Sequence, residues 1–240
     1  MKKSMKKLVL AGLVLLASVM VLVGCDTNAG GTDNGGATWS PAAEINKITE
    51  AGTHTIVVPP GYTDTAAIRT ALQELDKRNT ADSSKIQIHL DLSKTGIKSI
   101  KERAFAGCKS LTAVSLPSTV TTIGLYAFQS CVGLTEVTIP ATVINIGYGA
   151  FYNCGFLSSV KVEKDSVLKT IEQAAFGFCM NLQTIVIPAS VTSIGKDAFQ
   201  KCSSLKEINY RGTEEQWNEI DIDETNDKLI NATKNYNYTE

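Results

Sequence analysis

The chain has little of the chemistry that catalytic and metal-binding sites use. It contains two histidines, His54 and His89, which lie 35 residues apart, and neither has a cysteine nucleophile or a serine-containing elbow beside it. A histidine-based triad or metal centre therefore has little support. The sequence also lacks the Walker and dinucleotide-binding glycine motifs. We therefore expect a protein that is not an enzyme and that holds no cofactor and no metal.

An excess of positive charge is also missing. The chain has 23 Lys and Arg against 24 Asp and Glu, a formal net charge of −1. Nucleic acids and anionic lipid surfaces select clustered positive charge. We therefore expect no nucleic-acid partner.

The one long apolar run stands near the N-terminus. Four lysines fall within the first seven residues, and an uncharged apolar run follows over residues 8–23. The run is shorter than the ~20 residues of a transmembrane helix, so it predicts a secretory signal peptide over residues 1–24. It ends in LVGC, which resembles the lipobox of bacterial lipoproteins, where the cysteine, here Cys25, receives the lipid. An ordinary signal peptide with a chance cysteine and an uncleaved anchor are the alternatives.

Lipidation of Cys25 would determine how the chain is anchored to a membrane. Cleavage before Cys25 would remove four lysines and leave 19 basic against 24 acidic residues, a net charge of −5. Membrane contact would then come from the lipid, and stable anchoring takes more than one hydrophobic signal. Residues 25–41 carry four glycines and few apolar side chains, which predicts a flexible tether. The lipobox resemblance implies an exported, lipid-anchored protein of a bacterial membrane, and we expect the outer membrane or the cell surface.

A repeated phrase dominates the rest of the chain. Five Ala-Phe dipeptides recur with phenylalanine spacings of 23, 23, 25 and 23, and each is followed by a cysteine and then a leucine at intervals of three residues. The one longer spacing has two extra residues in the stretch EKDSV, at a corner where an insertion leaves the inward positions in register. Such agreement at a fixed period predicts a stacked solenoid. The core phenylalanines are Phe105, Phe128, Phe151, Phe176 and Phe199.

Each copy has a physical explanation, which LTEVTIPATVINIGYGAFYNC illustrates. Val137 and Ile139 are two positions apart, so both point to one side of a strand. Pro140 ends this strand because it has no N–H for a further ladder bond. Gly147 permits a sharp bend, and the next turn carries Phe151 to the middle of the coil. Such a unit cannot bury its apolar face alone, so it stacks on its neighbours.

Both ends of a solenoid expose core and need caps. Residues 42–85 predict an N-terminal cap of strand, helix and strand, with the helix over the first coil, and a separate binding domain is the alternative. The repeats occupy residues 86–210. Residues 211–240 predict a C-terminal cap and tail, of which we expect residues 235–240 to be disordered.

The motif Phe-x-x-Cys-x-x-Leu-x-x-Val/Ile, with Ile-Pro and Ile-Gly-x-x-Ala-Phe, resembles the BspA-like, or treponemal-type, leucine-rich repeats. The resemblance covers residues 86 to about 217. It implies a β-rich α/β fold, a right-handed solenoid of about five coils, with Trp217 covering the last coil. It also implies binding of protein ligands, with adhesion to host extracellular matrix or to other cells. A scaffolding lipoprotein within the envelope is the alternative, and we expect a monomer.

The repeat cysteines and the outward strand positions are the remaining candidates for chemistry. The cysteines have no C-x₂-C pair, which disfavours zinc, and the choice lies between disulfides joining neighbouring coils and buried thiols acting as small hydrophobes. The outward carboxylates Glu136 and Glu207 are three coils apart, ~14 Å at the strand spacing, too far for a glycosidase pair. The outward positions form either a recognition surface or a solvated sheet. They are Ala113, Glu136, Ser159, Thr184 and Glu207 in one column, and Ser115, Thr138, Lys161, Val186 and Asn209 in the other.

Overall fold

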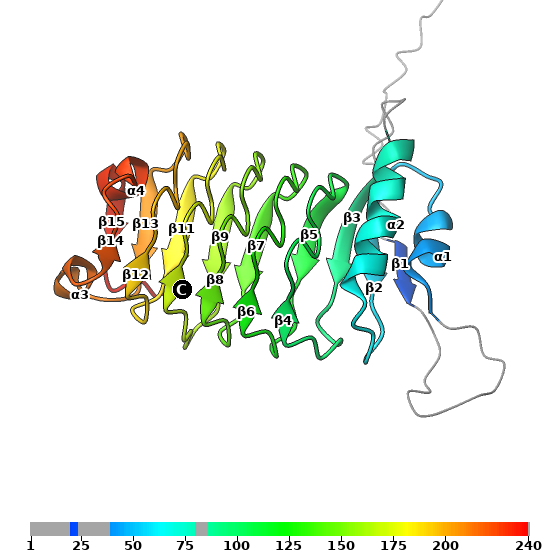
Figure 1. Ribbon diagram of the computed structural model, residues 1–240, viewed down its shortest axis with the longest axis horizontal. Helices are drawn as coiled ribbons and strands as arrows, with labels where there is room; N and C mark the ends of the chain where they lie inside the picture. Colours follow the sequence, from blue (N-terminus) through cyan, green and yellow to red (C-terminus); the bar gives the residue numbers. More distant parts are fainter. Residues whose placement is uncertain (1–19, 24–38, 80–85, 240) are drawn as a thin grey trace, which may run out of the picture.

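The computed structural model describes residues 20–23, 39–79 and 86–239, and these form a parallel β-solenoid (Figure 1). Cys25 and residues 25–38 of the predicted tether lie outside the described residues. In Figure 1 the coils stand side by side along the long axis of the molecule, with helices gathered at the two ends. The predicted fold class is therefore confirmed.

The longer strands of successive coils lie next to one another and run parallel. They form two sheets, in the orders β1-β2-β3-β5 and β15-β13-β11-β9-β7. A backbone hydrogen bond from Thr135 N to Thr112 O, 3.2 Å long, continues the row between β5 and β7. The strands are β1 (Met20–Val23), β2 (Gly52–Val57), β3 (Ile86–Asp91), β5 (Leu111–Ser115), β7 (Glu136–Ile139), β9 (Ser159–Val162), β11 (Thr184–Ile187), β13 (Glu207–Tyr210) and β15 (Thr233–Asn235).

A third sheet, made of two-residue strands, forms another side of the solenoid. It has six strands in the order β14-β12-β10-β8-β6-β4, so the described residues contain six coils that pair a long strand with a short one. The expected number was about five. The sixth coil, β13 with β14, carries no Ala-Phe dipeptide, so the spacing of that dipeptide did not reveal it. The short strands are β4 (Ser99–Ile100), β6 (Thr122–Ile123), β8 (Asn145–Ile146), β10 (Thr170–Ile171), β12 (Ser193–Ile194) and β14 (Asp221–Ile222).

The core is a column of stacked aromatic rings. The five repeat phenylalanines are fully buried, and neighbouring ring centroids lie 5.2 to 5.4 Å apart with the planes nearly parallel. In β7, Val137 and Ile139 are buried while Glu136 and Thr138 are exposed, as the alternation of a strand requires. Each of the first five coils therefore encloses one phenylalanine ring and buries the inward side of its strands.

The repeat cysteines form a second buried column. All five are free thiols. The Cys154 thiol donates a hydrogen bond to the carbonyl oxygen of Phe128 in the preceding coil, 3.1 Å away, and three other repeat cysteines make the equivalent bond at 3.0–3.2 Å. Burial raises the pKa of each of these five thiols. The buried-thiol interpretation is thus confirmed, and the alternative of disulfides between coils is wrong.

The glycine at the bend has a different role from the expected one. Gly147 has no positive φ, but a Cβ there would lie 2.9 Å from the carbonyl oxygen of Ile123 in the preceding coil. The equivalent Gly124 would place its Cβ 2.7 Å from Ile100 O. Glycine is needed at this bend because the backbones of adjacent coils approach closely.

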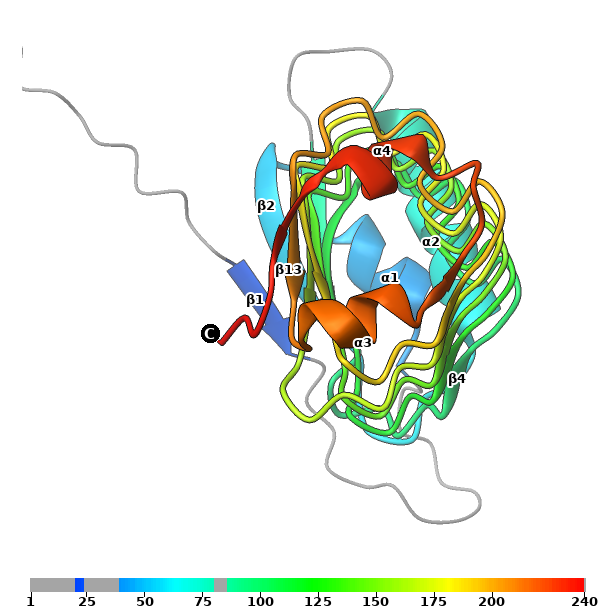
Figure 2. The ribbon, with the colours of Figure 1, turned by 90° about the vertical axis from the view of Figure 1, so that its left-hand side faces the viewer.

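The N-terminal end has the predicted order of strand, helix and strand, and a short helix that the sequence did not indicate precedes them. Figure 2 looks along the axis and shows α2 beside the coils, at their outer edge, while α1 lies across the middle at the far end. Ile45 of α1 is buried, and so are Ile68, Leu72 and Leu75 of α2, so both helices cover the end of the core. The helices are α1 (Pro41–Asn46), α2 (Thr65–Arg78), α3 (Glu214–Asn218) and α4 (Asp227–Asn231).

Side chains of α2 supply the hydrogen bonds that a preceding coil would otherwise make. Gln73 Nε2 donates to Ala106 O at 2.8 Å, and the Asp76 carboxylate accepts the backbone N–H of Ser110 at 2.7 Å. On the strand side, β2 pairs in parallel with β3, and β1 pairs with β2. Because β1 lies within the predicted signal peptide, cleavage before Cys25 would leave β2 as the edge strand.

Asn226 closes the C-terminal end. Its fully buried side chain accepts the N–H of Phe199 at 3.0 Å and donates to the carbonyl oxygens of Gly195 and Asp223 at 3.0 and 2.8 Å. In the repeats, by contrast, the equivalent Phe N–H donates to a carbonyl oxygen of the next coil. Asn226 thus replaces the missing coil.

Aromatic side chains complete the C-terminal cap. Trp217 is 7% exposed and packs edge-on against Tyr210, with ring centroids 5.1 Å apart. The expectation that the final residues are disordered is wrong for the described part, because Tyr238 N bonds to Tyr210 O at 3.0 Å and Asn237 N bonds to Gly212 O. The tail folds back along β13.

Candidate protein-binding face

Parallel register places outward side chains of successive coils in columns on the face formed by the longer strands. Glu136 pairs with Ser159, and Thr138 pairs with Lys161, across β7 and β9. Thr184 pairs with Ser159 on one side and Glu207 on the other. We call this surface the strand face.

A pocket of about 300 Å³ lies on the N-terminal half of the strand face. Four of the ten predicted face residues, Ala113, Ser115, Glu136 and Thr138, line it. The other six predicted face residues do not line it. The other lining residues are His89, Val114, Leu116, Val137, Pro140 and Glu163.

The two-residue insertion supplies one wall of this pocket. Glu163 begins the EKDSV stretch, and its Oε2 accepts the backbone N–H of Ala141 in the preceding coil at 3.0 Å. Its carbonyl oxygen accepts a hydrogen bond from Arg211 Nη1 at 2.7 Å, which ties the inserted corner to the end of the array. The insertion is therefore held in place and gives the strand face a local shape that regular coils lack.

His89 and Ser115 form a polar contact within the pocket that the sequence did not indicate. His89 Nε2 lies 2.8 Å from Ser115 Oγ. The register between β3 and β5 shifts after Ile88, so that His89 lies opposite Ala113. A bulge of this kind re-aims side chains, and sequence spacing alone does not locate it.

The two histidines lie on the adjacent strands β2 and β3 but face different sides of the sheet. His54 is 7% exposed and its Nε2 contacts Glu50 O at 2.9 Å, whereas His89 lines the pocket on the strand face. In residues 20–23, 39–79 and 86–239, no group of three or more His, Cys, Asp or Glu side chains is placed to hold a metal ion.

The charge on this face is mixed. Lys161 Nζ lies 3.4 Å from Glu136 Oε2, and both side chains are about half exposed, so the pair contributes little to stability. With Glu163 as the second carboxylate at the pocket, the surface offers acceptors for a basic side chain. The face can therefore make both a polar contact at the pocket and a wider contact along the strands.

One predicted residue of the face is not available to a partner. Val186 is 4% exposed, although its strand position points outward. Its side chain is short, and its register partner on β13 is the longer Asn209. The expectation that Val186 contributes to the exposed surface is therefore wrong.

These observations define a leucine-rich-repeat solenoid, and comparison with known families agrees. The family model described as BspA type leucine rich repeat region matches residues 84–220 in six copies. Because the match covers more than half of the chain, the chain belongs to the BspA-type leucine-rich-repeat family. Members of this class generally act in protein interaction and are typically not enzymes.

Solved structures show similar proteins. A Treponema pallidum leucine-rich-repeat protein, TpLRR, is 34% identical with a TM-score of 0.48, and the match covers 51% of this chain and 58% of TpLRR. The pneumococcal vaccine antigen PcpA is 21% identical with a TM-score of 0.42, covering 75% and 37%. A leucine-rich cell surface protein of Faecalibacterium prausnitzii is 23% identical with a TM-score of 0.33, covering 70% and 62%. The chain thus spans less than two thirds of each of these proteins.

No curated protein matches the chain. Among the helices of the described residues, none is both long and apolar enough to cross a membrane.

Proposed function

We propose that the chain is a lipid-anchored bacterial lipoprotein whose strand face binds a protein ligand in an adhesive role. The observation that carries this proposal is the pocket on the strand face, lined by side chains that differ between coils. Neighbouring coils bring Ala113, Glu136 and Ser159 to equivalent positions, while the buried positions repeat. Variation on an exposed face over a constant core is what a recognition surface requires.

The proposal places the partner's contact at the pocket. Glu136 and Glu163 provide carboxylates there. His89 and Ser115, which contact each other, provide further polar groups at the same pocket. A protein ligand with a Lys or Arg side chain at the centre of its contact surface fits this chemistry. The lipid on Cys25 would hold the solenoid at the membrane.

Charge reversal at the pocket tests the binding face. We expect Glu136→Lys with Glu163→Lys to abolish capture of immobilised host extracellular-matrix proteins or of whole cells by the purified chain. The matched control is Glu214→Lys with Glu224→Lys, which changes the net charge equally at exposed residues of the C-terminal cap. Equal loss in both variants would show non-specific electrostatics and contradict a specific face.

Two cellular measurements test the anchor and the location. Labelling with a fatty-acid analogue should tag the wild type and not Cys25→Ser. Protease treatment of intact cells should remove a surface-displayed protein. Protection from the protease, with binding to envelope proteins retained, would instead favour a scaffolding lipoprotein within the envelope.

A further inference from the structure

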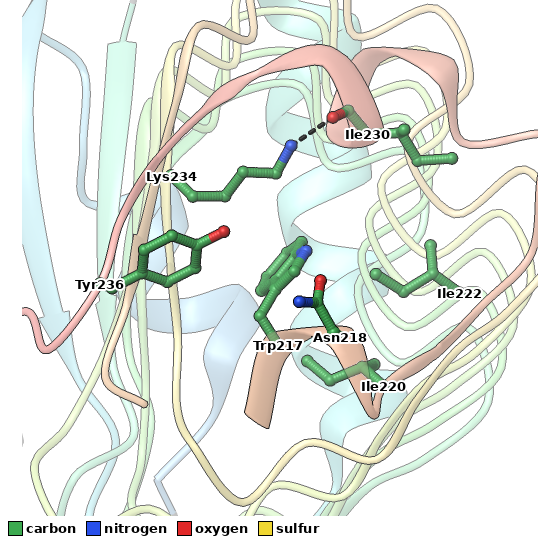
Figure 3. A pocket seen from close by; sticks show the side chains of 7 residues that line it. All are labelled: Trp217, Asn218, Ile220, Ile222, Ile230, Lys234 and Tyr236. Atoms are coloured by element: carbon green, nitrogen blue, oxygen red, sulfur yellow. Dashed lines mark hydrogen bonds between the residues drawn. The ribbon is translucent and has the colours of Figure 1, made fainter. Parts of the chain in front are cut away.

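A second pocket opens at the C-terminal end of the solenoid. It has a volume of about 360 Å³, which falls in the usual range for small-molecule sites, and three isoleucines and a tryptophan are among its seven lining residues. Figure 3 shows Lys234 and Tyr236 extending from one side, Ile222 and Ile230 on the other, and the Trp217 ring between them. No lining residue is acidic. The lining residues are Trp217, Asn218, Ile220, Ile222, Ile230, Lys234 and Tyr236.

Lys234 is the one charged group of this pocket. Its ammonium donates to the carbonyl oxygen of Ile230 and lies 5.8 Å from the centre of the Trp217 ring. In the described part of the chain no carboxylate lies within ion-pair distance of it. Desolvation lowers the pKa of Lys234. Lys234 is partly buried, so a carboxylate bound beside it would add an ion pair to the bond with Ile230 O and the contact with the Trp217 ring.

The other polar groups of the pocket also suit a bound head group. The Tyr236 hydroxyl and the Asn218 side-chain amide can both donate hydrogen bonds into the pocket. A few convergent polar groups beside apolar side chains are typical of a site that orients a small ligand.

The acidic residues of the C-terminal cap limit the positions at which an anion can bind. Desolvation and, to a smaller extent, Glu214 raise the pKa of Tyr236, and desolvation and Glu219 likewise raise the pKa of Tyr210. Neither carboxylate lines the pocket, and exposed charges are screened over ~10 Å at 0.1 M salt. An anionic group is therefore best placed against Lys234.

We propose that the C-terminal pocket binds a small amphiphilic monocarboxylate. The carboxylate pairs with the Lys234 ammonium, and the apolar body packs against Trp217 and the isoleucine wall. A purely apolar ligand would leave the ammonium unpaired, and a cation would be repelled by it. The site is separate from the strand face and does not depend on the function proposed for that face.

Trp217 provides the readout, with octanoate as the probe. The chain has two tryptophans, so Trp39→Phe in the full-length chain leaves Trp217 as the reporter. We expect a saturable change in its fluorescence with octanoate, and affinities at least about tenfold lower for 1-octanol and octylammonium. Equal affinity for octanoate and 1-octanol, or tighter binding of octylammonium, would overturn the proposal.

Substitutions test whether Lys234 is the group that binds the carboxylate of octanoate. Lys234→Met should weaken octanoate binding at least about tenfold, whereas Lys228→Met, the same charge change at an exposed residue of α4, should leave it unchanged. Equal weakening in both would rule out a specific pairing with Lys234.

If Lys234→Met unfolds the cap, Ile230→Glu is the second test, because Ile230 is 42% exposed and the new carboxylate would compete for Lys234. Unchanged octanoate binding by a folded Ile230→Glu protein would also overturn the proposal.

Discussion

At the scale of single residues, the stacked phenylalanines decide whether a coil can close. Phe151 is fully buried, and its ring stacks on Phe128 and Phe176 at centroid distances of 5.2 and 5.3 Å. Phe151→Ala removes both contacts and leaves a cavity that the adjacent coils cannot fill. We expect it to lower the free energy of unfolding by ~3–5 kcal/mol, measured by urea denaturation.

An exposed phenylalanine of the same chain is the matched control. Phe156 is 62% exposed and lies a few residues further along the chain. Phe156→Ala should change the free energy of unfolding by no more than ~0.5 kcal/mol. A Phe151→Ala protein as stable as this control would contradict the stacked core.

Backbone strain recurs in every turn next to the phenylalanine. Asp197 and Lys201, two residues before and after Phe199, have φ values of 55° and 59°. The other turns place residues with positive φ at the same two positions. This left-handed conformation costs a residue with a Cβ ~1–2 kcal/mol, and glycine avoids the cost. The turns therefore hold strain that the stacking of the coils overcomes.

Glycine at such a position should stabilise the protein. Lys201 is exposed, and Lys201→Gly should raise the free energy of unfolding by ~0.5–1 kcal/mol after the greater flexibility of unfolded glycine is subtracted. Lys206 is also exposed but has no positive φ, so Lys206→Gly should instead destabilise the protein by ~0.5–1 kcal/mol. Thermal melts of the two variants shifting in the same direction would count against strain at Lys201.

At the scale of the element, the thiol column couples stability to pH. Burial raises the pKa of Cys202 to about 12 in the folded protein, against ~8.5 for an unfolded cysteine. Above pH ~8.5 the unfolded thiol loses its proton while the folded thiol keeps it. The folded state then binds more protons, so stability falls as pH rises, by up to ~1.4 kcal/mol per pH unit for one thiol until pH 12.

Removal of one thiol should reduce this slope. We expect Cys202→Ala to lower stability at pH 7, because it removes the bond to Phe176 O, and to reduce the loss of stability between pH 9 and 11. Urea denaturation across that pH range measures both effects, and tyrosine titration is common to the two proteins. An unchanged slope would mean that the thiol does not titrate differently in the folded state.

The elements that repeat were predictable, and those that occur once were not. The five phenylalanines and the alternation around Val137 follow from a pattern stated several times in the sequence. Asn226 and Asp76 act once each, at opposite ends, so no periodicity marks them. The contact between His89 and Ser115 depends on a register shift, which has no sequence signal of its own.

The same limit applied to the candidate site. Ten outward positions followed from strand alternation, but the pocket that distinguishes four of them depends on where the inserted corner places Glu163. Burial of Val186 depends on the relative lengths of adjacent side chains. Local packing of this kind is a property of the folded surface, which strand periodicity does not determine.

At the scale of the whole molecule, each coil contacts mainly its two neighbours. Backbone hydrogen bonds and ring contacts run from one coil to the next, and the caps complete the same bonds at the two ends. Stability in such an array is close to a sum of terms for coils and for nearest-neighbour interfaces. The two ends of the solenoid should therefore be energetically independent.

A double-mutant cycle on the C-terminal cap tests this independence. Asn226→Ala leaves the N–H of Phe199 without its partner and should cost ~1–3 kcal/mol. Combined with Phe199→Ala it should be non-additive, with a coupling energy of ~0.5–3 kcal/mol, because both changes release the same coil. Combined with Phe105→Ala, at the other end of the ring column, it should be additive within ~0.5 kcal/mol. A large coupling to Phe105 would show that the solenoid behaves as one cooperative unit rather than as a chain of neighbours.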